Sequence, residues 1–364
     1  MWRWLFSILQ ECKMSKRRSI ANTVAPNGVT TIGLDIGYGV VKAVTSEAVI
    51  TFPSVAGHAR EIKFQQAEIA QRHPGDQISD DEGMWFVGDL ALAQLPPGEL
   101  LRLRGRTANE AAMGNLFRLR LAKVAIGKLL TGMGNRDAVH IRLATGLPCD
   151  HMRDAAELKK SLMGTHLIQT DAAEVVAHVT DVMVMPQPYG TIYSRTLTEA
   201  GDLNPTHTFM RTGVCDVGTY TVDVALDDDG EYIDAESGSV ESGVFTAQER
   251  IAEMLERDYR QKMPFKLVED VLRTGKFRAS GERVDYREAV EEALAPLRSA
   301  TLNLLSEKWK AGTTLDVVYL SGGGAELVLR EVMSAYPQTQ LVKNAQLANA
   351  QGYLNYARFA ERAS

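Results

Sequence analysis

The sequence is poor in cysteine, has no excess of positive charge, and opens with an apolar segment too short to cross a bilayer. Its three cysteines, Cys12, Cys149 and Cys215, lie far apart in 364 residues. An odd, widely spaced set argues against a disulfide framework and a cysteine metal site, and it favours a reducing cytoplasm. The net charge of −6 predicts no direct nucleic-acid binding, so nucleotides and proteins are the expected partners.

The first 28 residues differ from the rest of the chain. The apolar side chains between Trp2 and Leu9 fall on one arc of a helical wheel, and a basic stretch (residues 13–18) follows. This pattern is compatible with an interfacial amphipathic helix that makes a weak membrane contact, and also with a disordered leader. We therefore treat residues 1–28 as a leader and linker.

A glycine-tipped β-hairpin is predicted for residues 30–44, Thr-Thr-Ile-Gly-Leu-Asp-Ile-Gly-Tyr-Gly-Val-Val-Lys-Ala-Val. Two apolar, β-branched runs flank Gly37 and Gly39, where the backbone can turn with positive φ. Asp35 ends the first strand, just before amides that can face an anion. The stretch therefore suits a metal and phosphate site, and a surface hairpin with a solvated Asp is the alternative.

A second copy of this pattern lies about 180 residues further along, at residues 214–226, Val-Cys-Asp-Val-Gly-Thr-Tyr-Thr-Val-Asp-Val-Ala-Leu. Asp216 takes the place of Asp35, and Gly218 lies in the turn. Apolar residues make up 45% of the chain, enough for two cores of ordinary size. The repeat therefore predicts two similar domains, each giving one hairpin and one carboxylate to a ligand in the cleft between them.

A third loop of this kind joins a buried-type strand at residues 315–320 to a helix at residues 326–335. It reads Ser321-Gly322-Gly323-Gly324-Ala325, and glycines before a helix N-terminus let a ligand approach the backbone.

Two further segments are expected near the cleft. A strand over residues 175–184 runs into Pro186-Gln187-Pro188-Tyr189-Gly190, a proline-rich turn that would hold Gln187 rigidly. The last helix, about residues 345–362, begins with small residues that suit close packing or a hinge.

Taken in order, these motifs resemble the actin, sugar-kinase and heat-shock chaperone ATPase superfamily, and within it the ParM/StbA-like bacterial actins that segregate plasmids. The resemblance covers about residues 30–360. Residues 35–42 and 216–223 look like the two phosphate loops, and residues 319–325 look like the adenosine motif. Residues 186–190 and 348–352 resemble the two interdomain connections.

The resemblance implies an α/β, ribonuclease H-like, two-domain ATPase fold with mixed sheets flanked by helices and the nucleotide in the interdomain cleft. Domain I would span residues 29–212, with the C-terminal helix (346–364) packing back on it. Domain II would span residues 213–345.

The resemblance also implies roles for the residues of the cleft. Asp35 and Asp216 would hold Mg²⁺ through water, and with Gln187, which would orient the attacking water, they would form the catalytic set. Tyr38 and Tyr220 are bulky where other branches have Ser, Thr or Gly, so their side chains should point away from the phosphates. The residues expected to bind ATP are Gly37, Tyr38, Gly39, Lys42, Gly218, Thr219, Thr221, Gly322, Gly323 and Gly324.

One position departs from the family pattern, and the role of another is not decided by the resemblance. Val40 stands where plasmid actins often have Asn, and Asp223 can be a structural or a catalytic carboxylate.

The implied function is a cytoplasmic, ATP-hydrolysing protein that forms filaments with itself and segregates plasmid DNA through a separate DNA-binding adaptor. A small-molecule kinase of the same superfamily and a membrane-associated actin-like scaffold are the alternatives. The choice between ATP and GTP is left open by these motifs.

Overall fold

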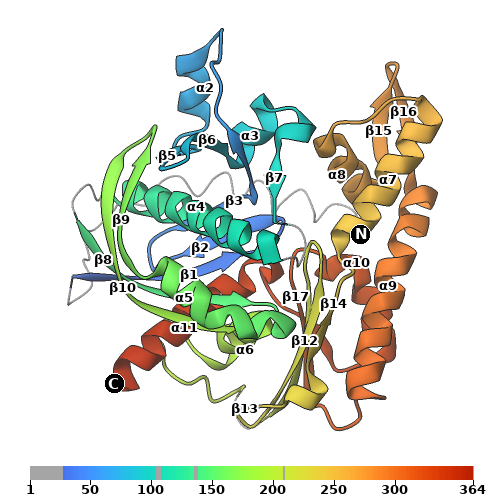
Figure 1. Cartoon of the computed structure of the whole chain (residues 1–364). Helices are drawn as coiled ribbons and strands as arrows, with labels where there is room; N and C mark the ends of the chain where they lie inside the picture. Colours follow the sequence, from blue (N-terminus) through green and yellow to red (C-terminus); the bar gives the residue numbers. More distant parts are fainter. Residues whose placement is uncertain (1–27, 104–107, 135–137, 208–209, 364) are drawn as a thin grey trace.

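The computed structural model describes residues 28–103, 108–134, 138–207 and 210–363. These residues form two α/β units, each built on its own mixed sheet and flanked by helices, as the predicted two-domain fold requires (Figure 1). The leader up to residue 27 lies outside the described residues. Among the described helices, none is long and apolar enough to cross a membrane.

The N-terminal unit is built on a ten-stranded sheet in the order β3-β2-β1-β8-β10-β9-β5-β6-β4-β7. Strand β1 pairs antiparallel with β2 and parallel with β8. The strands are β1 (Val29–Ile36), β2 (Val40–Val44), β3 (Val49–Pro53), β4 (Val55–His58), β5 (Gln77–Asp80), β6 (Gly83–Val87), β7 (Leu101–Arg102), β8 (Val139–Leu147), β9 (Gly164–Thr170) and β10 (Glu174–Pro186).

Helices cover both faces of this sheet. The helices that accompany it are α2 (Gln66–Arg72), α3 (Gly88–Gln94), α4 (Ala108–Gly132), α5 (Ala155–Leu162), α6 (Gln187–Thr196) and α11 (Ala348–Ala363). Side chains alternate along a strand, so Leu34 shares a core with Leu121 of α4 while Gly33 points the other way. A Cβ on Gly33 would lie 2.0 Å from Ala350 O, so α11 packs directly on the backbone of β1.

The C-terminal unit is built on a sheet in the order β13-β12-β11-β17-β18, with β14 also paired to β12. Its strands are β11 (Arg211–Val217), β12 (Val222–Asp228), β13 (Glu231–Tyr232), β14 (Gly238–Val240), β17 (Val317–Ser321) and β18 (Thr339–Leu341), and a separate hairpin consists of β15 (Lys276–Ala279) and β16 (Glu282–Asp285). Its helices are α7 (Val244–Tyr259), α8 (Phe265–Thr274), α9 (Arg287–Trp309) and α10 (Ala325–Ala335). Four 3-10 turns are described in the two units: η1 (Pro97–Glu99), η2 (Cys149–Asp154), η3 (Asp234–Glu236) and η4 (Ala345–Leu347).

The backbone contains the internal repeat that the sequence predicts. Strand β1 forms a hairpin with β2 and lies parallel to β8, and β11 forms a hairpin with β12 and lies parallel to β17. In the strand register of the hairpins, Asp35 lies opposite Lys42 and Asp216 lies opposite Asp223. Each unit therefore places its aspartate at the carboxyl end of a central strand, where α/β proteins build their sites.

The predicted turn at residues 186–190 is wrong, because Gln187 is the first residue of α6. Pro186 precedes the helix and Pro188 lies in its first turn, where backbone N–H groups have no helical partner and a proline costs little. Gln187 is therefore held at a helix N-terminus. The structure also contains strand β9 and the β15–β16 hairpin, which were not predicted from the sequence.

Helices α6 and α11, the segments by which the chain passes between the two sheets, touch at two glycines. A Cβ on Gly352 would lie 1.6 Å from Gly190 O, and a Cβ on Gly190 would lie 2.5 Å from Asn349 Cα. The two backbones are thus in direct contact, which confirms the close packing predicted for the start of the last helix.

From this contact we predict that adding one methyl group at Gly352 destabilises the protein. Alanine favours a helix over glycine by about 1 kcal/mol, yet Gly352→Ala should lower the free energy of unfolding by about 1–3 kcal/mol because its methyl group overlaps the α6 backbone. Urea unfolding measures the change. Gly114→Ala in α4 is the control. Its Cβ would meet only Arg118 Nη1, at 3.7 Å, so this substitution should stabilise the protein. Equal stability of the two variants would contradict the contact.

Candidate functional site

The tips of both hairpins, the start of α6, the β17–α10 loop and the start of α11 surround one cavity. Its empty volume is about 540 Å³, the space at its mouth included. It is lined by Asp35, Gly37, Tyr38, Gly39, Val40, Lys42, Gln187, Asp216, Gly218, Thr219, Thr221, Asp223, Gly322, Gly323, Gln346 and Asn349.

All the predicted site residues except Gly324 line this cavity. A Cβ on Gly324 would lie 2.5 Å from Val244 and 2.6 Å from Val217, so this glycine packs against apolar side chains. The fold thus gathers residues from four distant parts of the sequence, and the chemical roles assigned to them stay predictions.

Asp35 is held by two side chains. Lys42 Nζ lies 2.8 Å from Asp35 Oδ2, and Gln187 Nε2 donates to Asp35 Oδ1 at 3.1 Å. The first contact follows from the hairpin register, which sets Asp35 opposite Lys42. The second places the Gln187 amide beside the carboxylate at the N-terminus of α6.

Asp216 is held differently, by a neutral partner. Asn349 Nδ2 donates to Asp216 Oδ2 at 2.6 Å. Burial raises the pKa of Asp216 to about 7, and the nearby carboxylates of Asp223 and Asp35 add to the rise. The Asn349 hydrogen bond and Lys42 offset part of it.

The β17–α10 loop approaches this carboxylate closely at Gly322. Gly322 has a φ of +89°, and a Cβ there would lie 2.2 Å from Asp216 Oδ1. Only glycine meets both conditions, so the loop passes against Asp216 by backbone alone.

A buried hydrogen-bond network connects the two interdomain helices at this point. Thr191 Oγ1 of α6 lies 2.9 Å from Asn349 Oδ1 and 2.9 Å from Ser321 Oγ. The network fixes the Asn349 amide so that its N–H faces Asp216.

The two helices share the same spacing between amide and glycine: Gln187 precedes Gly190 by three positions, and Asn349 precedes Gly352 by three. Residues three apart share a helix face, so the contact that joins the helices also aims both amides at the carboxylates.

Asp223 lies opposite Asp216 across the second hairpin and has its own hydrogen-bond donors. Thr221 Oγ1 donates to Asp223 Oδ2 at 2.7 Å, and Ser239 Oγ donates to the other oxygen. Burial raises the pKa of this carboxyl group. Its two oxygens are occupied by hydroxyl groups of its own unit, which favours the structural interpretation over a catalytic one.

The two hairpin tips meet across the cavity. A Cβ on Gly39 would lie 2.1 Å from Thr219 Oγ1. Within the described residues, the N–H groups of Gly39 and Thr219 donate no hydrogen bond, whereas Gly218 N–H donates to Thr221 O at 2.8 Å. The tips can therefore offer backbone donors to an anion, although Gly218 itself uses its donor in the turn.

The rings of Tyr38 and Tyr220 are in contact at the hairpin tips. Their rings meet edge to face at 5.6 Å, and Tyr220 also packs on Phe245 at 4.6 Å. Both tyrosines line a second, more open cavity of about 1370 Å³, open solvent included, which is also lined by Pro148 and His151. Of the two, only Tyr38 also lines the first cavity.

Gln346 and Asn349 line the site without having been assigned to it from the sequence. Asn349 lies in the predicted connection at residues 348–352, and its signal was an amide among small residues at the start of a helix. Gln346 gave no comparable signal.

The two halves of the chain match two family models. Residues 33–190 match the model described as actin like proteins N terminal domain. Residues 214–334 match that described as archaeal actin homologue MreB-like, C-terminal. Among curated proteins, none matches the chain by sequence.

Solved structures share the fold over nearly the whole chain. A 15-stranded ParM filament from Clostridium botulinum has a TM-score of 0.71 and 20% identity, over 91% of this chain and 99% of that chain. An archaeal actin homologue in complex with ADP has a TM-score of 0.69 and 18% identity, over 92% of this chain and 100% of that chain. Apo pSK41 ParM has a TM-score of 0.67 and 18% identity, over 93% and 99%.

The environment of Asp216 predicts a pH dependence of stability. The unfolded carboxyl group ionises near 3.8 and the folded one near 7, so between these values the folded protein binds more protons. Without divalent metal, the unfolding free energy should fall as the pH rises through this window. Asp216→Asn should remove this fall and be more stable than the unchanged protein at about pH 8. Thermal unfolding from about pH 4 to 8 measures it, with exposed Asp81→Asn as control, and parallel curves for all three proteins would contradict it.

Proposed function

This chain belongs to the actin-like proteins, and from that premise we propose that it binds and hydrolyses ATP with Mg²⁺ and assembles with itself into filaments. The observation that carries the proposal is the meeting of Asp35, Lys42, Asp216 and Gln187 in one cavity between the units. Two hairpins that each bring a carboxylate and backbone donors are suited to a phosphate chain with its cation.

The donors that line the cavity fit a magnesium ion. Three carboxylates, Asp35, Asp216 and Asp223, face one ammonium group, that of Lys42, and Asp216 has only a neutral hydrogen-bond partner. Asp35 and Asp216 would hold Mg²⁺ through water, because this ion loses its hydration shell reluctantly. The bound ion would supply charge neutralisation at the phosphoryl oxygens.

The rest of the cavity would hold the nucleotide. The free N–H groups of Gly39 and Thr219, together with Lys42, would bind the phosphates, while Gly322 and Gly323 would lie against the adenosine. Gly39 and Thr219 are in contact, so phosphates between them require the tips to separate. Nucleotide binding would thus change the angle between the units.

Gln187 would orient the attacking water. Its amide is fixed by Asp35 at 3.1 Å and by its place at the start of α6. A neutral amide is no strong base, so hydrolysis would rest mainly on the metal and the loop donors. This also speaks against a small-molecule kinase, for which the remaining candidate base, Asp223, is engaged by Thr221 and Ser239.

The biological role we propose is the segregation of plasmid DNA in the cytoplasm. The net charge of −6 argues against direct contact with DNA, so a separate DNA-binding adaptor would connect filament and cargo.

Assembly is the first test of this function. With Mg-ATP above a critical concentration the protein should pellet as filaments, and EDTA should prevent it because the uncompensated carboxylates repel the phosphates. High-speed sedimentation with parallel phosphate release measures both, and GTP in place of ATP tests the base preference. Absence of polymer under every nucleotide condition would refute the proposal, and phosphate transfer to added hydroxyl compounds would support the kinase.

Gln187→Ala should separate binding from chemistry. Loss of the positioning amide should slow phosphate release on the order of 10–10³-fold while ATP affinity changes little, and filaments formed with ATP should persist longer. Gln346→Ala is the matched control, because this amide lines the cavity without a carboxylate partner among the described residues. Light scattering and phosphate release are followed on one sample. An unchanged rate for Gln187→Ala would mean that another residue positions the water.

A further inference from the structure

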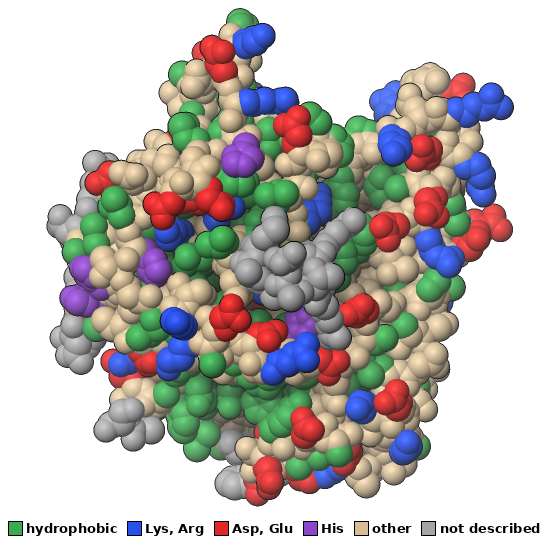
Figure 2. All heavy atoms as spheres, viewed as in Figure 1, with side chains coloured by type: hydrophobic (Ala, Val, Ile, Leu, Met, Phe, Trp, Pro, Cys, Tyr) green, Lys and Arg blue, Asp and Glu red, His purple; other side chains and the backbone are tan. Residues whose placement is uncertain are grey.

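One end of the C-terminal unit is basic. Between residues 260 and 287, at the end of α7, α8 and the β15–β16 hairpin, there are eight Lys or Arg residues and four Asp or Glu residues. Two of these cations are paired locally, Arg273 with Asp270 and Arg287 with Asp285. Figure 2 shows Lys and Arg side chains, interspersed with Asp and Glu, on the upper right lobe of the molecule, where Figure 1 places β15 and β16. Exposed cations without an ion pair to a described residue are Arg260, Lys262, Lys266, Lys276, Arg278 and Arg283.

The opposite end of the same unit is acidic. The segment 227–236, from the end of β12 through β13 and η3, has six Asp or Glu residues and no Lys or Arg. Arg211 pairs with Asp228 and Glu236, while Asp229, Glu231 and Asp234 are exposed and make no ion pair with a described residue. Figure 1 shows β13 at the lower end of the unit and the β15–β16 hairpin at its upper end.

Helix α9 holds these two ends apart. Its 23 residues span about 34 Å. At its start, Tyr286 N–H donates to Gly275 O beside the basic hairpin at 2.7 Å. At its end, Trp309 Nε1 donates to Glu236 O in the acidic segment at 2.9 Å. The basic and acidic segments are therefore each connected to one end of the same helix.

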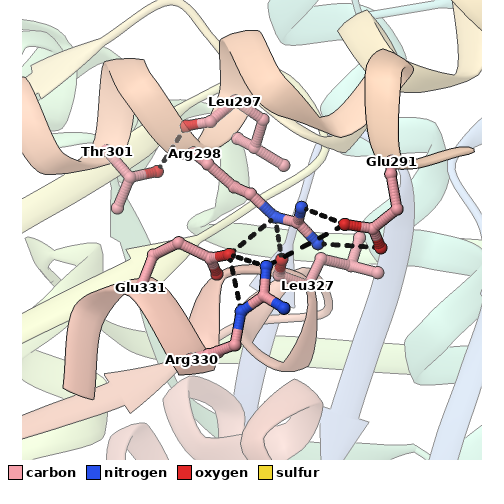
Figure 3. A network of polar contacts seen from close by, with 7 residues as sticks. All are labelled: Glu291, Leu297, Arg298, Thr301, Leu327, Arg330 and Glu331. Atoms are coloured by element: carbon pink, nitrogen blue, oxygen red, sulfur yellow. Dashed lines mark hydrogen bonds and ion pairs between the residues drawn. The ribbon is translucent and has the colours of Figure 1, made fainter. Parts of the chain in front are cut away.

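A polar network braces α9 in its middle against α10 (Figure 3). Arg298 of α9 donates to Leu327 O of α10 at 3.1 Å and pairs with Glu291 at 2.7 Å. Arg298 Nε also lies 3.5 Å from Glu331, which pairs with Arg330. The network lies next to Pro296, where the helix lacks a backbone donor, so the brace supports α9 at its weakest turn.

We infer that the basic end of one copy docks on the acidic end of the next copy, so that charge complementarity sets the head-to-tail contact of the filament. The inference rests on the proposed self-assembly. A contact between two different surfaces at opposite ends of a molecule is head-to-tail and cannot have two-fold symmetry. When copies add through this contact in one direction, they form an open chain. Complementary charges fix the orientation of such a contact and speed its formation. The acidic residues interspersed on the basic end favour this occupant over nucleic acid.

Charge-reversal variants test the contact, and the strand register identifies positions where a reversal should not destabilise the fold. Glu231 lies opposite Asp228 and Arg283 lies opposite Arg278, so reversing Glu231 or Arg283 relieves a like-charge pair within the fold. The acid-end variant is Glu231→Lys with Asp234→Lys. The basic-end variant is Lys266→Glu with Arg283→Glu.

Each variant alone should raise the critical concentration with Mg-ATP by about ten-fold or more, because the two reversed charges repel like charges on the unchanged end of the next copy. An equimolar mixture should assemble again with both variants in the pellet, since in an alternating chain the introduced lysines meet the introduced glutamates and every other contact joins two unchanged ends. Mg-ATP affinity should stay unchanged in both, because neither end reaches the cavity. As matched controls, Glu288→Lys with Glu292→Lys and Arg153→Glu with Lys160→Glu should pellet like the unchanged protein.

Normal assembly of either variant alone, or failure of the mixture while the unchanged protein pellets, would overturn the inference. The proposed self-assembly fails separately, if the unchanged protein does not pellet. In that case sedimentation velocity of the mixture at low salt decides: a complex larger than either variant supports the contact and its absence overturns it. Binding of a plasmid DNA fragment that is lost only in the basic-end variant, with its assembly intact, would assign this face to nucleic acid.

Discussion

The backbone contact between α6 and α11 is the constraint on which the site depends. At Gly190 and Gly352 no side chain separates the helices, so their relative position is fixed by two main chains rather than by adaptable packing. On each helix an amide side chain lies three residues before the glycine. Gln187 reaches Asp35 and Asn349 reaches Asp216 because the helices cross there. A crossing displaced by one helical residue would aim both amides elsewhere.

The two aspartates that receive these amides differ in their electrostatics. Asp35 has a cation, Lys42, as its hairpin neighbour, whereas the corresponding neighbour of Asp216 is another carboxylate, Asp223. Burial raises the pKa of Asp216, and repulsion from the Asp223 carboxylate adds to this rise. A repeat that began as two similar hairpins thus gives one compensated and one uncompensated carboxylate. The uncompensated one gains most from a bound cation.

Much of this arrangement could be predicted from the sequence, because glycines and strand-terminal aspartates leave local signals. Both hairpins and the loop at Gly322 were located from such signals, and the resemblance added the actin-like fold. Other features could not be predicted. The prolines around Gln187 suit a turn and a helix start equally well until the following residues are seen to pack. The hydrogen bond from Asn349 to Asp216 joins residues with no local relation, and the domain boundaries stay a prediction. The contact of Gly39 with Thr219 likewise depends on how two separate cores are set against each other.

The basic and acidic segments at the two ends of α9 also make the C-terminal unit an electric dipole. Cations gather at the β15–β16 end and anions at the β12–β13 end, separated by the length of the helix. Two molecules within about 10 Å of each other at 0.1 M salt feel this field before their surfaces touch. In the proposed assembly, this field would turn an approaching molecule into the parallel orientation during diffusion. Polarity in this protein is a property of the free subunit, present before any assembly begins.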